Sequence, residues 1–405
     1  MTKNKKLLIF VALISMVGFI LPPFSGAQDI TYNPQLYLSG EYNDNIRFSS
    51  TDKEDDFIYS ITPVMELNYS SELFNLNSLG VVQFVRYHSE SDADREDYYI
   101  DLKGTYRMTE RLRFRGKLDY LKDFSLETRN IDQIDTGIGE DPIEDPVTER
   151  GIENFLSERN RYNALASLNY QLTELSNLSV GYRYLDVEYD LEDNTDYVVN
   201  DLYLTYMRNL AGQKDQIGTK LNYTRRSSDV SDTDSYETGL IWKHIYTETI
   251  TLYTNIGLRY SEETFKNSDQ KDDDWGGTAD IRLRKLGETN VMNIALRQGL
   301  QTASSGSSAN VTRLYGDVTQ RLSQRFVVSL NGDFYITRED GDFSSDIDTV
   351  TFDVNPSLRY VLAENYAVRL SYNYTIKHDR RVEENRDRER NSVWIAFEFG
   401  FPNKW

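Results

Sequence analysis

The sequence has no cysteine and only three histidines among its 405 residues. Without cysteine, a disulfide framework, a zinc–thiolate site and a cysteine nucleophile are all excluded. The histidines are His88, His244 and His378, with Ser89 after the first and Asp379 after the last. Many hydrolases use His with Ser or Asp, but such sequence neighbours are commonplace. We therefore predict a protein that is not an enzyme and that carries no cofactor, no metal and no catalytic residue.

An excess of basic residues is also lacking. The chain has 45 Lys and Arg against 65 Asp and Glu, a formal net charge of −20. Nucleic-acid binding needs a basic footprint to neutralise phosphates. The composition therefore excludes nucleic acid as an expected partner.

Long apolar runs are missing beyond the N-terminus. The run Leu7–Leu21 follows several lysines, is ended by two prolines and precedes the small residues Ser25-Gly26-Ala27. It is shorter than the ~20 apolar residues that a spanning helix needs, so a signal peptide is favoured over a membrane anchor. We predict a signal peptide over residues 1–27 and one domain, a membrane barrel, over residues 28–405.

Tyrosine is abundant, with 29 residues, and apolar residues alternate with polar ones over many short segments. In the ranges 98–107, 112–120 and 366–376, nearly every second residue is apolar or small. This period of two is typical of strands with one apolar and one polar face. A soluble β-sandwich shows the same alternation, but its strands are usually shorter.

The connections between these segments alternate in length, which is typical of outer-membrane barrels. Eight short and nine long connections give 18 strands, with 16 as the alternative count. We therefore predict an all-β fold: a single transmembrane antiparallel β-barrel with short periplasmic turns and long extracellular loops. The short connections lie near Ser70-Ser71-Glu72, Thr109-Glu110, Thr173-Glu174, Gly212-Gln213, Thr247-Glu248, Gly287-Glu288, Ser323-Gln324 and Ala363-Glu364. The long ones run from Asp44 to Asp55, Ser89 to Glu96, Asp123 to Glu158, Val187 to Asp196, Ser227 to Asp234, Glu262 to Asp273, Ala303 to Asn310, Glu339 to Asp348 and Asp379 to Arg390.

The C-terminal segment carries aromatics on one parity: Phe397, Phe399, Phe401 and Trp405. A membrane barrel turns such a face to lipid and places the terminal aromatic in the interfacial girdle. The ending resembles the terminal aromatic signature by which bacterial outer-membrane barrels are recognised for insertion. We therefore expect location in the bacterial outer membrane, with membrane lipid, lipopolysaccharide and the barrel-assembly machinery as partners.

If the apolar parity faces lipid, the opposite parity lines the lumen. That set holds seven acids, Glu66, Asp101, Asp119, Asp280, Asp317, Asp333 and Asp353. Rings of Arg and Lys favour anionic solutes, but Arg–Asp ladders also simply stiffen a barrel wall. Both interpretations remain open for the thirteen basic residues predicted to face the lumen: Lys103, Arg107, Arg113, Arg115, Lys117, Arg183, Arg259, Arg282, Arg284, Arg297, Arg313, Arg359 and Arg369.

The connection from Asp123 to Glu158 is far longer than the others and contains eleven acids. Long loops in compact domains are usually functional or disordered. A lid or constriction across the lumen is therefore the favoured interpretation, and a disordered surface loop is the alternative.

The segment Tyr37-Leu38-Ser39-Gly40-Glu41-Tyr42-Asn43-Asp44-Asn45 resembles the first strand of the β-barrel porin 2 family of bacterial outer-membrane proteins. The resemblance extends through Tyr-rich hairpins to the terminal aromatic. It implies a porin-like protein without a catalytic motif. Several members occur with exopolysaccharide biosynthesis and export systems, which implies a polysaccharide and periplasmic export components as partners.

Three functions follow as expectations. The first is an exit pore for an exopolysaccharide or another anionic polymer. The second is a general solute porin. The third is a non-conducting structural or adhesin-like barrel that uses its acidic loops.

Overall fold

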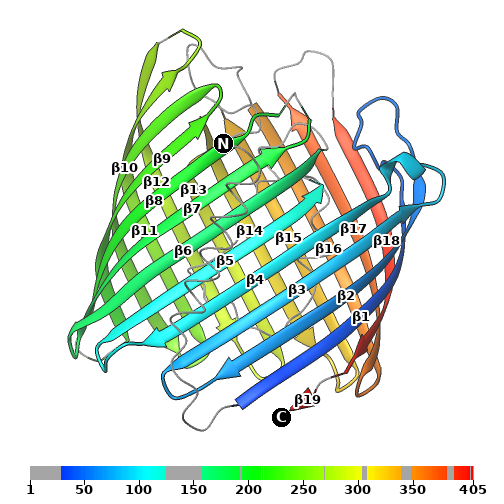
Figure 1. Cartoon of the computed structure of the whole chain (residues 1–405), viewed down its shortest axis with the longest axis horizontal. Coiled ribbons are helices and arrows are strands. Elements are labelled where there is room, and N and C mark those ends of the chain that lie inside the picture. Colours follow the sequence, from blue (N-terminus) through cyan, green and yellow to red (C-terminus); the bar gives the residue numbers. More distant parts are fainter. Residues whose placement is uncertain are drawn as a thin grey trace.

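In the computed structural model, eighteen antiparallel strands pair in sequence order and close into a barrel by pairing β1 with β18 (Figure 1). The structure describes residues 29–124, 157–191, 194–210, 212, 214–268, 270–302, 308–338, 348–380, 387–401 and 403–404. The predicted signal peptide and most of the Asp123 to Glu158 loop lie outside the described residues. The prediction of an 18-stranded all-β barrel is confirmed, and the count of 16 is wrong.

The strands are 13 to 17 residues long, apart from the two-residue β19. A single 3-10 turn, η1 (Ser91–Ala93), lies between β3 and β4. Among the described residues, no helix is long and apolar enough to cross a membrane. The strands are β1 (Asp29–Asn43), β2 (Asp56–Ser70), β3 (Phe74–Tyr87), β4 (Arg95–Arg107), β5 (Leu112–Phe124), β6 (Glu158–Thr173), β7 (Ser176–Tyr189), β8 (Tyr197–Asn209), β9 (Asp215–Ser228), β10 (Ser231–Thr247), β11 (Ile250–Phe265), β12 (Lys271–Leu286), β13 (Asn290–Thr302), β14 (Ser308–Arg321), β15 (Phe326–Arg338), β16 (Asp348–Ala363), β17 (Tyr366–Asp379), β18 (Arg388–Gly400) and β19 (Asn403–Lys404).

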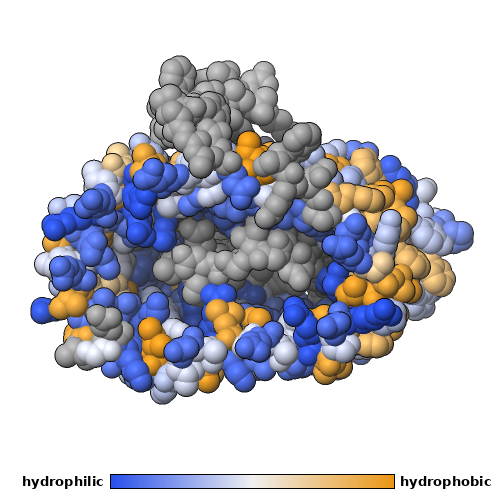
Figure 2. Space-filling view, turned by 90° about the horizontal axis from the view of Figure 1, so that it is seen from below, coloured by the Kyte–Doolittle hydropathy of each residue, from blue (hydrophilic) through white to orange (hydrophobic). Residues whose placement is uncertain are grey.

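The predicted alternation separates an exposed apolar face from a buried polar one. On β2, Phe57, Ile61 and Met65 are 51–52% exposed, whereas Thr62 and Val64 are 3–5% exposed. Large apolar side chains remain exposed on the outside of nearly every strand, and Figure 2 shows apolar residues on the outer flank of the oval ring. A closed barrel leaves no unpaired edge in lipid, and an apolar outside is what lipid requires. The barrel is therefore a transmembrane barrel of the bacterial outer-membrane type.

An aromatic row marks the loop-side border of the apolar belt on four neighbouring strands. Tyr236 is paired with Tyr223 on β9 and with Tyr260 on β11, and Tyr260 is paired with Trp275 on β12. The ring centroids are 5.2 Å apart for Tyr223 and Tyr236, and 5.1 Å apart for Tyr260 and Trp275. Aromatic rings prefer the interface between lipid and water, so this row fixes the membrane level.

A second aromatic set lies near the short turns. Phe326 stacks beside Tyr360 at 4.7 Å, and Tyr366 meets Phe399 edge-on at 5.7 Å. On β10 the turn-side aromatic Tyr246 lies ten positions after Tyr236. With a rise of ~3.3 Å per residue and a tilt near 40°, this spacing gives an apolar belt about 25 Å tall. That height matches the lipid-facing band of an outer-membrane barrel.

Seven of the nine predicted long loops fall close to the gaps between strands, but two predictions are wrong. The expected Ser227 to Asp234 loop is a two-residue turn between β9 and β10, in which the Ser228 hydroxyl accepts the backbone N–H of Ser231 at 3.0 Å. The expected Glu262 to Asp273 loop shrinks to residues 266–270, and Asp272–Asp274 lie within β12. In both places the strands continue above the membrane, where the outward face is charged because it meets water.

The seam that closes the barrel is short and regular. Nine residues of β1 pair with β18, from Gln35 opposite Gly400 to Asn43 opposite Ser392. Beyond Phe401, β19 returns to pair with Thr31 and Tyr32 of β1. This pairing extends the sheet almost to the first residue of β1, Asp29. The described start and end of the barrel lie together on the turn side (Figure 1).

Candidate functional site on the inner wall

The inner wall is the candidate site because a barrel of eighteen strands encloses a space wide enough for solutes. All thirteen basic residues predicted to face the lumen lie on the parity opposite the exposed apolar residues. They occupy β4, β5, β7, β11, β12, β13, β14, β16 and β17. Their role in solute passage stays a prediction, and their electrostatic surroundings follow from their contacts.

Several of these arginines are paired with a carboxylate on a neighbouring strand or nearby on their own. Arg183 Nε lies 2.6 Å from Asp201, and Arg313 Nη2 lies 2.7 Å from Asp333. Arg282 Nε donates to Asp280 at 2.7 Å. These pairs run along the wall as charge-assisted hydrogen bonds, which hold the guanidinium groups in fixed positions.

Glu398 on β18 is a shared partner for two predicted residues. Its two carboxylate oxygens lie 2.6 Å from Arg359 Nε and 2.7 Å from Arg369 Nε. Glu398 is 7% exposed and the Arg369 side chain 12%, whereas the Arg359 side chain is 37% exposed, so the carboxylate is enclosed and one of its two partners faces the lumen. Glu398 was absent from the acids predicted to face the lumen, although it shares the parity of Trp394 and Ala396.

On β4 and β5 two lysines share two aspartates. Lys103 lies 3.3 Å from Asp101, and Lys117 lies 3.4 Å from Asp119 and 3.9 Å from Asp101. Arg115, two residues before Lys117, also has a partner. This part of the wall is a compact charge network rather than a bare positive strip.

Aromatic rings flank the arginines of β12 to β14. The Arg313 guanidinium lies 4.6 Å from the Tyr315 ring and 5.2 Å from the Tyr335 ring. The Arg282 guanidinium lies 5.4 Å from the Tyr253 ring. Arg297 approaches both Asp280, at 3.6 Å, and the Tyr315 ring, at 5.7 Å. Such stacking fixes the planar side chains further.

Arg259, on β11, ties the loop-side ends of three strands together. It is 3% exposed, and its guanidinium lies 2.9 Å from Asp274 on β12 and 3.0 Å from Asn310 on β14. Asp274 belongs to the run Asp272-Asp273-Asp274, part of which the sequence predicts to lie in the loop from Glu262 to Asp273. Within the described residues, no group of three or more His, Asp or Glu side chains could hold a metal ion.

Only a few of the thirteen predicted residues have no carboxylate partner. Arg107 donates to the backbone oxygen of Glu72 at 2.7 Å, near a short turn. Among the described residues, no carboxylate lies within ion-pair distance of Arg113 or Arg284. In the described part of the chain, Arg107, Arg113 and Arg284 are therefore the predicted positions without a carboxylate partner on the turn-side half of the wall, and of these Arg107 is bonded to a backbone carbonyl.

Sequence reasoning missed a second group of inner basic residues near the loop side. Arg159 is 3% exposed and donates to Asp123 at 2.8 Å, and Arg161 lies 3.7 Å from Asp119. Both share the inward parity of β6, so that strand's alternation was the available signal. The missed residues lie on the inward parity of their own strands and include Arg95, Arg159, Arg161, Arg226, Lys377 and Arg390.

The first two loop-side connections are joined by one arginine. Arg47 Nε lies 2.6 Å from Glu54 in its own loop, and Arg47 Nη2 lies 3.1 Å from Glu90 in the next one. The hydrogen bond to Glu90 raises the pKa of the Arg47 guanidinium above its usual value. This contact braces the outer rim above β1–β4.

The histidines lie in separate parts of the barrel. His244 Nδ1 is 2.7 Å from Asp215, next to Trp242 on the outward face of β10. His378 Nδ1 is 2.7 Å from Asp387 rather than from the adjacent Asp379. His88 follows β3, where its backbone N–H donates to Phe57. The structure therefore does not bring the three histidines together.

No family model matches this sequence, and no curated protein is significantly similar to it. Among solved structures it is similar to the outer-membrane protein OpdK from Pseudomonas aeruginosa, at 10% identity over 92% of this chain and 99% of that one, with a TM-score of 0.45. It is also similar to OccAB3 from Acinetobacter baumannii, at 10% identity over 92% and 99% of the two chains, with a TM-score of 0.46. The ferric citrate transporter FecA matches at 8% identity over 91% and 78%, also with a TM-score of 0.46. At these values no role is transferred to this chain.

Proposed function

We propose that this protein is a passive channel across the bacterial outer membrane. The observation that carries the proposal is the inner wall, which is polar and charged on the same strands whose outer face is apolar. An 18-stranded barrel with a polar interior is wide enough for an aqueous path. A purely structural barrel has no need for a hydrophilic wall of this extent.

The substrate that we propose is an exopolysaccharide chain leaving the cell, with a general solute porin as the competing function. The resemblance to the β-barrel porin 2 family supports export and implies periplasmic export components as partners. Lipopolysaccharide around the barrel and the barrel-assembly machinery, which reads the terminal aromatics, complete the proposed partners. A uniformly anionic polymer is less favoured than the sequence suggests, because most wall arginines are paired.

Efflux from liposomes tests the export proposal. The reconstituted protein should release a labelled linear polysaccharide, and protein-free liposomes should retain it. A general porin would instead admit small sugars and amino acids in a swelling assay while retaining the polymer. Retention of both polymer and small solutes would favour the adhesin-like barrel.

A further inference from the structure

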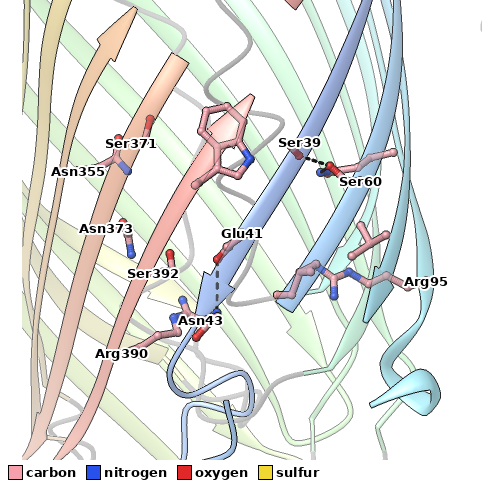
Figure 3. Close-up of a pocket in the computed structure, with 14 residues that line it drawn as sticks. Ser39, Glu41, Asn43, Ser60, Arg95, Asn355, Ser371, Asn373, Arg390 and Ser392 are labelled. Atoms are coloured by element: carbon pink, nitrogen blue, oxygen red, sulfur yellow. Dashed lines mark hydrogen bonds between the residues drawn. The ribbon is translucent and has the colours of Figure 1, made fainter. Parts of the chain in front are cut away.

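A small cavity is recessed into the inner wall where the first strands meet the last ones (Figure 3). We call it the notch. Its volume is about 40 Å³, and its lining comes from β16–β18 and from β1–β4. A space of that size takes about three water molecules. Asn355, Ser371, Asn373 and Trp394 line it, and each is 3–9% exposed.

Four polar atoms of these side chains have no hydrogen-bond partner in the part of the chain that the structure describes. They are Asn355 Oδ1, Ser371 Oγ, Asn373 Oδ1 and Trp394 Nε1. Strand pairing gathers them, since Ser371 lies directly opposite Trp394. Buried polar groups are nearly always paired, because an unmade hydrogen bond is costly. Four such atoms in one cavity therefore indicate an occupant.

The orientation of both amides is fixed by their nitrogen atoms. Pro356 has no backbone N–H, and the side-chain nitrogen of Asn355 donates instead to the Tyr372 carbonyl at 3.1 Å. A carbonyl oxygen only accepts hydrogen bonds, so the Asn355 side-chain atom next to the Tyr372 carbonyl must be the amide nitrogen. One N–H of the Asn355 amide is thus engaged within the wall, and its oxygen remains without a partner among the described residues.

The Asn373 amide is oriented by a chain of two hydrogen bonds. Its side-chain nitrogen donates to Thr375 Oγ1 at 3.3 Å, because the Thr375 hydroxyl itself donates to Asp353 at 2.8 Å. The notch therefore presents two amide oxygens as acceptors, one indole N–H as a donor, and one hydroxyl that can do both.

This pattern discriminates between classes of ligand. A carboxylate or phosphate brings acceptors and leaves the two amide oxygens unpaired. An ammonium group brings donors only, so it leaves the indole N–H of Trp394 without an acceptor. Hydroxyl groups both donate and accept, so a polyhydroxylated solute satisfies the acceptors and the donor together.

We propose that the notch is a binding subsite for the hydroxyl groups along one edge of a saccharide unit. The sugar ring stays in the lumen while its hydroxyls enter the notch. This proposal rests on the proposed channel function, because a saccharide reaches the notch through the lumen. It names a class, neutral polyhydroxylated chains, and makes the wall of β16–β18 their contact surface.

Calorimetric titration of the folded full barrel tests the proposal independently of conduction. The barrel is kept in a detergent without a sugar headgroup and titrated with maltohexaose or with a polyethylene glycol of matched mass. Maltohexaose should bind saturably, and the polyether, which has acceptors but no donors along its chain, should not. Trp394→Phe and Ser371→Ala should each weaken maltohexaose binding by about five- to tenfold, the effect of one lost hydrogen bond.

Ser329→Ala is the matched control, because the Ser329 hydroxyl lies on the inner wall and is already paired with Thr319 at 3.0 Å. It should leave binding unchanged, and heat-modifiable migration should show that each variant is folded. Equal affinity for the polyether, or unchanged affinity in both notch variants, would overturn the proposal. So would the absence of saturable binding. Sugar binding without ion conductance would contradict the proposed channel function but would still support the notch as a saccharide subsite.

Discussion

At the residue scale, several carboxylates of the inner wall each contact more than one basic side chain. Glu398 accepts from two arginines on neighbouring strands, and Asp101 approaches two lysines. Buried charges are tolerated only when they are paired and hydrogen-bonded, so each carboxylate fixes its partners' positions. The ladder interpretation of the wall therefore accounts for most of the predicted basic residues, and anion attraction is confined to the few that lack a carboxylate.

The Glu398 cluster gives the first prediction. Glu398→Gln removes the charge that compensates Arg359 and Arg369, and we expect it to lower the free energy of unfolding by about 2 kcal/mol. Urea unfolding followed by tryptophan fluorescence measures this change. Glu262→Gln is the control, because the Glu262–Lys271 pair is 41% and 65% exposed and should contribute below ~1 kcal/mol. Equal losses in the two variants would contradict an enclosed Glu398 carboxylate.

At the element scale, strands β9–β12 continue past the aromatic row on the loop side of the barrel. Above that row their outward face carries charges: Asp234 pairs across the sheet with Arg225 and with Glu262. Sequence reasoning assigned these residues to loops because charge runs usually mark loops. Composition does not show where the lipid ends along a strand. A strand that continues beyond the membrane has polar residues at its outward positions, and the alternation that predicts a strand is lost there.

Depth along β11 gives the second prediction. Ile256 is 56% exposed within the apolar belt, and Thr264 lies on the same outward face above the aromatic row. We expect Ile256→Arg to destabilise the barrel by about 2–4 kcal/mol, and Thr264→Arg by at most about 1 kcal/mol. Unfolding from phospholipid bilayers provides the comparison. Similar costs at both positions would mean that the apolar belt is misplaced.

At the scale of the whole molecule, alternation and connection length were enough to predict the closed 18-stranded barrel and its outward face. The inward parity of the thirteen basic residues also followed, because period two leaves only two faces. Their pairing did not follow: Arg359 and Arg369 meet at Glu398 only through the register of β16, β17 and β18. The notch could not be predicted from the sequence either. It depends on Pro356, which has no N–H, so that the Asn355 amide nitrogen donates to the backbone in its place.

The uncompensated wall charges give the third prediction. Replacing Arg113 and Arg284 together with Gln should shift the reversal potential in a KCl gradient toward cation selectivity, more strongly at low salt. The double variant Arg313→Gln with Asp333→Asn removes one ion pair and leaves the net charge of the wall unchanged, so it should cause little shift. A shift as large in this control as in the arginine variant would show that net wall charge does not set selectivity.

Single-channel recording in planar lipid bilayers tests the central claim most directly. Folded, heat-modifiable wild-type protein should insert and produce discrete, reproducible current steps in KCl, because a polar wall around an 18-stranded barrel forms a path for ions. Insertion of folded protein without any current steps above the bare bilayer would contradict the account and leave a closed structural barrel in its place.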